Sequence, residues 1–334
     1  MTHLGWSDSL SVAESGRVRA VLAAAHAADG VGPVSDDVAL AVRPGAAPAA
    51  GRGHLLAAGP ADDISGYAHL AHASDGAWEA ELVVRPEMRR RGVATALVDA
   101  LVGRVADGLP AAATASHPST LDVWAHGDSA AAAALAARTG FERGRVLLQL
   151  RRPLTASGDD ELPDPVWPTG VTVRTFVPGR DERSWLALNA RSFATHPEQG
   201  RWTEQDLLPR EAEPWFDPAG FFLAERDGEL AGFHWTKVHA EDPMPPEGKN
   251  PADRTDPAPA IGEVYVVGVD PARAGGGLGR ALTLAGLRHL RDRGLASVML
   301  YVDEDNARAV RLYERLGFTR YAVDAQYRRR IPAG

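Results

Sequence analysis

The chain has 334 residues, a length that suits two domains of about 150 residues each better than one hydrophobic core. Its 36 Lys and Arg stand against 44 Asp and Glu, and the formal net charge of −8 argues against a protein that coats nucleic acid. Cysteine is absent, which excludes disulfides, thiolate nucleophiles and Cys-ligated metals. The N-terminal segment carries acidic residues and no leader pattern, and no long apolar run follows. We therefore expect a soluble, cytoplasmic protein without membrane contact.

The first half predicts a mixed α/β domain. We expect helices where apolar residues recur at helical spacing and strands where apolar and polar residues alternate. Gly, Pro or Asp residues mark the breaks between these elements. We expect helices over 11–28, 91–106 and 129–138, a helix start before 38–42, a loop over 46–53, and strands over 54–59, 65–72, 78–84, 121–125 and 146–150.

The second half repeats this order after a Pro-rich linker. The predicted domains are 1–152 and 169–334, with the linker over 153–168. An insert over 241–261 has six prolines and little apolar content, so we expect a mobile surface loop there. The other expected elements are helices over 182–193, 277–293 and 306–316 and strands over 220–226, 229–239, 263–269, 297–302 and 321–327.

The repeat is visible in the letters themselves. Residues 81–98 and 266–283 each spell an apolar strand, a glycine-bearing turn and a helix start, and Thr139–Arg143 matches Leu316–Arg320 some tens of residues later. The chain is therefore predicted to hold two copies of one fold in tandem.

The turn Arg89-Arg-Arg-Gly-Val-Ala94 predicts an anion site. A glycine between strand and helix lets several amide N–H groups and the positive end of the helix dipole face one point. A plain flexible turn is the alternative interpretation, and a nucleic-acid patch is an alternative for the arginines. The whole order of strand, turn, helix, strand, helix and Gly-Phe favours a phosphate-bearing acyl carrier.

This compound pattern, with Asn306-Ala-Arg-Ala-Val-Arg-Leu-Tyr-Glu-Arg-Leu-Gly-Phe318, resembles the GCN5-related N-acetyltransferases. The resemblance implies two tandem α/β domains, each a mixed, mostly antiparallel sheet flanked by helices. It implies acetyl-CoA as co-substrate, with a splayed strand that accepts the pantetheine arm. Ala274 departs from the family's Gln or Arg, but the loop acts through backbone donors, so we expect CoA binding to survive. The implied CoA-binding residues are Leu82, Val83, Val84, Arg89, Arg90, Arg91, Gly92, Val93, Ala94, Thr95, Val267, Gly268, Val269, Ala274, Gly275, Gly276, Gly277, Leu278, Gly279, Arg280, Asn306, Ala307, Arg308, Ala309, Val310 and Arg311.

Stretches 196–200, 233–239 and 262–271 look like those of tandem family members that acetylate the cysteinyl amine of cysteinyl-glucosaminyl-inositol in a ternary complex. That resemblance implies substrate contacts for Asp36, Glu198, Lys237, Glu263 and Tyr301. Asp36 is shorter than the usual glutamate, and a helix N-cap is nearly as good an interpretation. Glu198 and Lys237 could equally be solvated charges.

Catalysis is expected in the second half. Aligning the copies on Pro86 and Pro271 places Trp78 opposite Glu263, and aligning them on Gly-Phe places Ala136 opposite Tyr313. The first half then lacks both proton-handling groups and is expected to bind CoA as a scaffold or regulator.

We assign Glu263 as general base, acting through water, and Tyr313 as general acid for the CoA thiolate. Period two should place residues 263, 265, 267 and 269 on one strand face. The alternatives are a salt bridge from Glu263 to Lys237, and a Tyr313 that merely packs on Phe318.

Other functions stay open at this point. An acetyltransferase for another small amine and a non-catalytic acyl-CoA sensor both fit parts of the pattern. His196, His234 and His239 have no third ligand at convincing spacing, so no metal is expected. We expect a monomer whose partners are acetyl-CoA and a small-molecule substrate, without nucleic acid.

Overall fold

The computed structural model describes residues 3–46, 48, 51–59, 63–72, 77–108, 119–154, 162–196, 199–240 and 259–332. The chain divides into two units. Within the described residues, the first unit takes those up to 147 and those from 323 on, and the second takes 148–240 and 259–322. The last five residues of the domain predicted as 1–152 thus belong to the second unit. The C-terminal segment, predicted to close the second domain, groups with the first unit.

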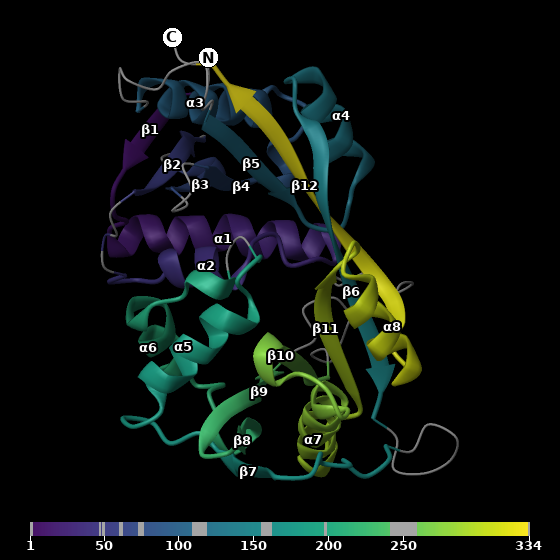
Figure 1. The fold of residues 1–334 in the computed structure, drawn as a ribbon. Coiled ribbons are helices and arrows are strands. Elements are labelled where there is room, and N and C mark those ends of the chain that lie inside the picture. The colour runs from purple at the N-terminus through teal and green to yellow at the C-terminus, as the bar shows by residue number, and fades with distance from the viewer. Residues whose placement is uncertain are drawn as a thin grey trace. The chain divides into compact units, whose positions relative to one another are not determined.

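The first unit is a sheet in the order β1-β2-β3-β4-β5-β12, in which the neighbours are antiparallel except for the parallel pair β4 and β5 (Figure 1). Its strands are β1 (Leu4–Ser7), β2 (Arg52–Ala58), β3 (Ile64–His72), β4 (Trp78–Val84), β5 (Ser119–Ala125), the early part of β6 (Glu142–Pro153) and the late part of β12 (Thr319–Ile331). Its helices are α1 (Val12–Asp29), α2 (Asp36–Ala41), the 3₁₀ turn Pro86–Met88, α3 (Val93–Asp107) and α4 (Ala130–Arg138).

Helices cover both faces of this sheet. α1 begins at a capping box in which Ser11 and Glu14 bond each other's backbone N–H groups, and Val18 packs against Tyr67 of β3. On the other face, Leu97 of α3 lies in a second core cluster with Leu55 and Leu70 of the sheet. Burial of these apolar faces, at roughly 25 cal/mol per Å² of apolar surface, is the main term that holds the layers together.

The second unit is a sheet in the order β6-β11-β10-β9-β8-β7, in which β10 and β11 are parallel and the pairs from β10 to β7 are antiparallel. Its strands are the late part of β6, β7 (Val171–Thr175), β8 (Phe221–Arg226), β9 (Glu229–His239), β10 (Ile261–Val269), β11 (Ser297–Asp303) and the early part of β12. Its helices are α5 (Glu182–Ser192), α6 (Glu204–Glu211), α7 (Leu278–Asp292), α8 (Ala307–Arg315) and 3₁₀ turns over Gln199–Arg201, Pro218–Gly220 and Pro271–Arg273.

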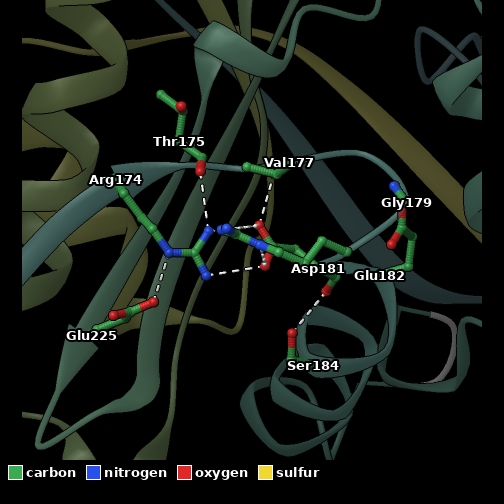
Figure 2. Close-up of polar contacts among 9 residues, drawn as sticks. Arg174, Thr175, Val177, Gly179, Asp181, Glu182, Ser184 and Glu225 are labelled. Carbon is green, nitrogen blue, oxygen red and sulfur yellow. Dashed lines mark hydrogen bonds and ion pairs between the residues drawn. The ribbon is translucent and has the colours of Figure 1, made fainter.

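A polar network joins β7, β8 and the start of α5 (Figure 2). Arg174 donates two hydrogen bonds to the buried carboxylate of Asp181, at 2.6 and 3.0 Å, and one to Glu225 at 2.7 Å. Asp181 also accepts from the backbone N–H of Val177 at 2.8 Å. Burial would raise the pKa of Asp181, but these hydrogen bonds hold it below its usual value.

The predicted fold class is confirmed, and nearly every expected element is present. The four-residue β1, the five-residue β7 and α6 escaped prediction. Pro209 inside α6 hid that helix, although Thr203 and Asp206 form a capping box at its start. Residues 241–258 of the predicted insert and 155–161 of the predicted linker lie outside the described residues. Over the described chain, no helix combines the length and apolar character that a bilayer crossing needs.

Candidate active site

The turn between β10 and α7 is built from glycine. Gly275, Gly276 and Gly277 have φ values of 125°, 59° and 83°, a region that side chains disfavour. Gly277 is the residue before α7, and no side chain caps the helix there. The first amide N–H groups of the helix and its dipole therefore face a loop without a Cβ in the way, which is the geometry of an anion site. Ala274, at the position where the family pattern has Gln or Arg, ends the preceding 3₁₀ turn.

A β-bulge interrupts β10 beside this turn. The register with β9 shifts between Val264 and Val266, so that Tyr265 is an extra residue. The parallel pairing with β11 runs from Gly262 with Val298 to Val264 with Leu300 and ends at the bulge. A bulge leaves its extra residue out of the ladder and bends the strand. Strict period two therefore fails here, and the prediction of one shared face is wrong for residues 263, 265, 267 and 269.

The bulge puts Glu263 and Val267 on opposite faces. Glu263 lies opposite Lys237 in β9, whereas Val267 lies opposite His234, an odd number of residues away. Val267 packs in the cluster that contains Leu278 of α7. Contacts between the cofactor and the backbone of β10 do not depend on which face the side chains occupy, because main-chain N–H groups lie in the plane of the sheet.

Glu263 is a buried carboxylate with a histidine partner. It is 6% exposed, and its Oε2 accepts from His239 Nε2 at 2.7 Å. Lys237, its cross-strand neighbour, lies with Nζ 4.8 Å from the ring centre of Trp215 and 5.1 Å from that of Tyr265. The partner of Glu263 is thus His239, rather than the Lys237 of the alternative interpretation, and sequence reasoning missed this hydrogen bond.

Tyr313 lies on the inner side of α8, and its ring contacts Phe318 edge to face at 5.7 Å. Asn306 caps this helix by accepting from the N–H of Ala309 at 3.1 Å. Burial raises the pKa of Tyr313 to about 12. The phenol therefore keeps its proton at neutral pH, as a proton donor must.

Two of the remaining predicted substrate residues, Tyr301 and Asp36, lie within the described residues. Tyr301 of β11 is 39% exposed, and its hydroxyl accepts from Gln149 Nε2 at 2.7 Å. In the first unit, Asp36 is an exposed residue in the first turn of α2, where Ser35 provides the N-cap. Glu198 lies outside the described residues.

The histidines serve other purposes. His196 lies 3.7 Å from Asp303. His234 is fully buried, bonds the carbonyl of Leu282 at 2.8 Å, and has its pKa lowered to about 4 by that burial. Within the described ranges, no group of three or more His, Asp or Glu side chains could hold a metal ion.

The first unit contains a cavity of about 850 Å³ between the diverging ends of β4 and β5 and the start of α3. The pairing of β4 with β5 ends at Glu81 with Trp124, beyond which the strands separate. The predicted CoA-binding residues that line the cavity are Leu82, Val83, Val84, Arg89, Arg90, Gly92, Val93, Ala94 and Thr95, and Arg91 does not line it. Arg89 also pairs with both carboxylate oxygens of Asp29, at 2.7 and 2.6 Å.

Strand register corrects the comparison of the two copies. Gly66 lies opposite Val84 in the first unit, as Gly232 lies opposite Val269 in the second. Five residues further along β3 and β9, the partners are Glu79 and Glu263 respectively. Counting residues back from Pro86 and Pro271 pointed to Trp78, because β4 has no counterpart of the bulge. The prediction that the first copy lacks this carboxylate is therefore wrong.

The matched helices α4 and α8 differ in the phenol that only α8 carries. α4 and α8 are both nine residues long, with caps at Ser129 and Asn306, and the seventh residue after the cap is Ala136 in one and Tyr313 in the other. The first unit therefore has the carboxylate on its strand and no phenol on its helix.

A buried cluster beside the cavity was also missed by sequence reasoning. His126 lies between Glu81, at 3.4 Å, and Asp324, at 3.2 Å. Burial alone would lower the pKa of His126, but the hydrogen bonds and charges of the two carboxylates raise it to about 10. No sequence signal joins these residues, because β4, the end of β5 and β12 are far apart in the chain.

Comparison with known proteins identifies the family. The acetyltransferase (GNAT) family model matches residues 39–141 and 185–318. A protein of Parafrankia sp. named mycothiol acetyltransferase is 59% identical over 98% of this chain and 99% of its own length, and one of Thermomonospora curvata is 55% identical over 97% and 96%. A GCN5-related N-acetyltransferase structure from Sphaerobacter thermophilus is 25% identical, with a TM-score of 0.67 and coverage of 99% and 96%. A tandem GNAT protein from the clavulanic acid biosynthesis pathway, 19% identical with a TM-score of 0.68 and coverage of 99% and 100%, shares the fold. The chain therefore belongs to the acetyltransferase (GNAT) family, whose members take the acetyl group from acetyl-CoA.

Proposed function

We propose that this protein is a mycothiol synthase. Its second unit transfers the acetyl group of acetyl-CoA to the cysteinyl amine of cysteinyl-glucosaminyl-inositol, by direct attack in a ternary complex. The observation that carries the proposal is the 59% identity, over nearly the whole of both chains, to a relative named mycothiol acetyltransferase.

The proposed reaction begins with the amine. Glu263, acting through water, takes a proton from the ammonium, and the neutral nitrogen attacks the thioester carbonyl carbon. A C–N bond forms while the carbonyl oxygen becomes an oxyanion, which main-chain N–H groups beyond the bulge in β10 stabilise. The oxyanion then collapses to the amide carbonyl, the C–S bond breaks, and Tyr313 protonates the leaving thiolate. The second proton of the attacking amine leaves to solvent, and the phenol of Tyr313 regains a proton from solvent.

Deprotonation of the amine accounts for only a small part of the activation barrier. An α-amine with a pKa of about 8 is roughly one-tenth neutral at pH 7, so removing its proton costs only about 1 kcal/mol. Much of the rate enhancement is then expected from positioning amine and thioester together. Glu263 is suited to this, because the hydrogen bond from His239 fixes its orientation.

The glycine turn before α7 is proposed to bind the CoA pyrophosphate, with Ala274 to Arg280 supplying main-chain donors. Lys237 and Tyr301 are proposed as substrate contacts in the same unit. Asp36 and Glu198 remain predictions from the family resemblance.

The first unit is proposed to bind acetyl-CoA in its cavity and to act as a scaffold or regulator rather than as the transferase. Its support is the cavity itself, lined by residues predicted from the turn pattern. Ala136 in place of a helix phenol argues against acetyl transfer there. We also propose that the protein acts as a monomer in the cytoplasm.

Product analysis tests the proposal. The full chain is incubated with acetyl-CoA and cysteinyl-glucosaminyl-inositol, and mass spectrometry should show the gain of one acetyl group on the cysteinyl nitrogen. Aminoglycosides and free peptide N-termini serve as competing amines and should stay unmodified. Faster turnover on one of those amines would overturn the substrate assignment.

A further inference from the structure

The cavity of the first unit contains a buried phenol that is not accounted for by the packing around it. Tyr327 of β12 is 6% exposed and lines the cavity, and its hydroxyl has no hydrogen-bond partner among the described residues. The guanidinium of Arg143 lies near the phenol, but both carboxylate oxygens of Asp128 hold it, at 2.7 and 2.8 Å, and the described residues form no hydrogen bond to the phenol oxygen.

A hydroxyl in these surroundings is unfavourable unless something bonds to it. Tyr327 packs in an apolar cluster with Val98 of α3 and Phe141, and partly buried Leu135 of α4 lies against the same cluster. A hydroxyl taken from water without a new partner loses its hydrogen bonds, whereas phenylalanine would fill the same space without that loss. The phenol is therefore best explained by a partner that enters the cavity.

The position of Tyr327 matches the place where the helix phenol is missing. Ala136, the counterpart of Tyr313, belongs to the same core cluster as Tyr327, and both residues line the cavity. A small residue on α4 thus leaves space on that side of the sheet, and a tyrosine from β12 fills part of it. The first unit has a phenol in its cavity after all, delivered by a different element.

Strand register places this phenol at the inner end of the cleft. Tyr327 pairs with Val123 of β5, and Val123 pairs with Ala80 of β4. One residue further, the pair Glu81 with Trp124 is the last before the strands separate. An extended arm that starts at the phosphate turn beside Gly92 and runs between the strands ends at this level.

We propose that Tyr327 is the hydrogen-bond donor to the sulfur-bearing end of the acyl-CoA bound in the first unit, so that this site is completed by the C-terminal strand of the chain. The inference rests on the proposed binding of acetyl-CoA to the first unit. It gives the first unit a specific contact to the thioester, which a site that held only the phosphates would lack.

Calorimetry and hydrogen exchange on the full chain test this, with acetyl-CoA as the probe. Hydrogen exchange of peptides covering the start of α3 reports the first unit, and peptides covering the start of α7 report the second. The wild type should bind two molecules per chain and show protection in both regions. In Tyr327→Phe the affinity of the first unit should fall about 2- to 13-fold, the range of one neutral hydrogen bond, while that of the second unit is unchanged.

The melting temperature of the ligand-free protein gives a second readout. Because Tyr327→Phe removes an unpartnered hydroxyl, it should leave that temperature unchanged or raise it. Tyr67→Phe is the matched control, since Tyr67 is also buried in the first unit but its hydroxyl bonds His54 at 2.7 Å and it does not line the cavity. This control should lower the melting temperature and leave both affinities unchanged.

Several results would overturn the inference. One is an unchanged affinity of the first unit in Tyr327→Phe, and another is a wild type in which the start of α3 gains no protection. The proposed function fails separately, when the wild type binds two acetyl-CoA molecules but acetylates no cysteinyl-glucosaminyl-inositol.

Discussion

Replacing His126 by glutamine should destabilise the first unit strongly and change its response to pH. The imidazole lies between two carboxylates that are themselves buried, Glu81 and Asp324, and it donates to both. Glu81 also accepts from the N–H of Ser35 at 2.7 Å, and Asp324 from that of Gly127 at 2.8 Å. Removing the cation leaves two negative charges in a poorly solvated place.

The magnitude follows from that geometry. Breaking a buried ion pair by removing one partner costs about 3–5 kcal/mol. For a unit of this size, we expect the melting temperature to fall by roughly 6–20 °C at neutral pH, since each kcal/mol corresponds to about 2–4 °C.

The pH dependence has a definite sign. The folded-state pKa of His126 is raised to about 10 from its usual 6.5, so its contribution to stability is complete below about pH 6.5 and is lost as the pH rises through about 10. Thermal unfolding of the wild type between pH 6.5 and 10 should therefore show a progressive loss of stability, which His126→Gln should lack. His69→Gln is the control, because burial lowers the pKa of His69 to about 4 and the ring is already neutral. Parallel pH curves for wild type and His126→Gln would refute the reasoning.

Three further outcomes are expected. Arg174→Met should lower the free energy of unfolding of the second unit by at most about 3 kcal/mol in urea denaturation, because it removes the two hydrogen bonds from Arg174 to the buried Asp181 while Arg180, 3.2 Å from the same carboxylate, partly compensates. A loss under about 0.5 kcal/mol would contradict this. Gly286→Ala should lower the free energy of unfolding by about 1–3 kcal/mol in the same assay, because its Cβ would overlap the buried imidazole ring of His234 in β9. Wild-type stability in this variant would contradict the described packing of α7 on β9. His239→Gln should reduce kcat/KM about 5- to 100-fold, because the hydrogen bond that orients Glu263 is weakened, whereas an unchanged kcat/KM would leave His239 with a structural role alone.

Sequence patterns predicted the parts of the fold that local signals determine. Helix α8 could be predicted over 306–316 because capping and amphipathic spacing are signals from residues close together in the chain. The glycine turn before α7 was predicted for the same reason, since three consecutive residues with positive φ favour glycine through local sterics.

The rest depends on strand pairing between distant segments. One inserted residue at Tyr265 turns the following side chains to the other face, and hydrophobic alternation gives no warning in a strand buried on both sides. For that reason Glu79 was overlooked as the counterpart of Glu263. Tyr327 and Asp324 were overlooked because β12 joins β5 of the first unit from the other end of the chain.

The most direct test of the account is the single-turnover rate of acetyl transfer to cysteinyl-glucosaminyl-inositol by Glu263→Gln and Tyr313→Phe, with acetyl-CoA affinity measured alongside. The account predicts a loss of about 100-fold or more for Glu263→Gln and a clear loss for Tyr313→Phe, both with acetyl-CoA binding intact. Wild-type turnover in either variant would contradict the assignment of acid and base to the second unit.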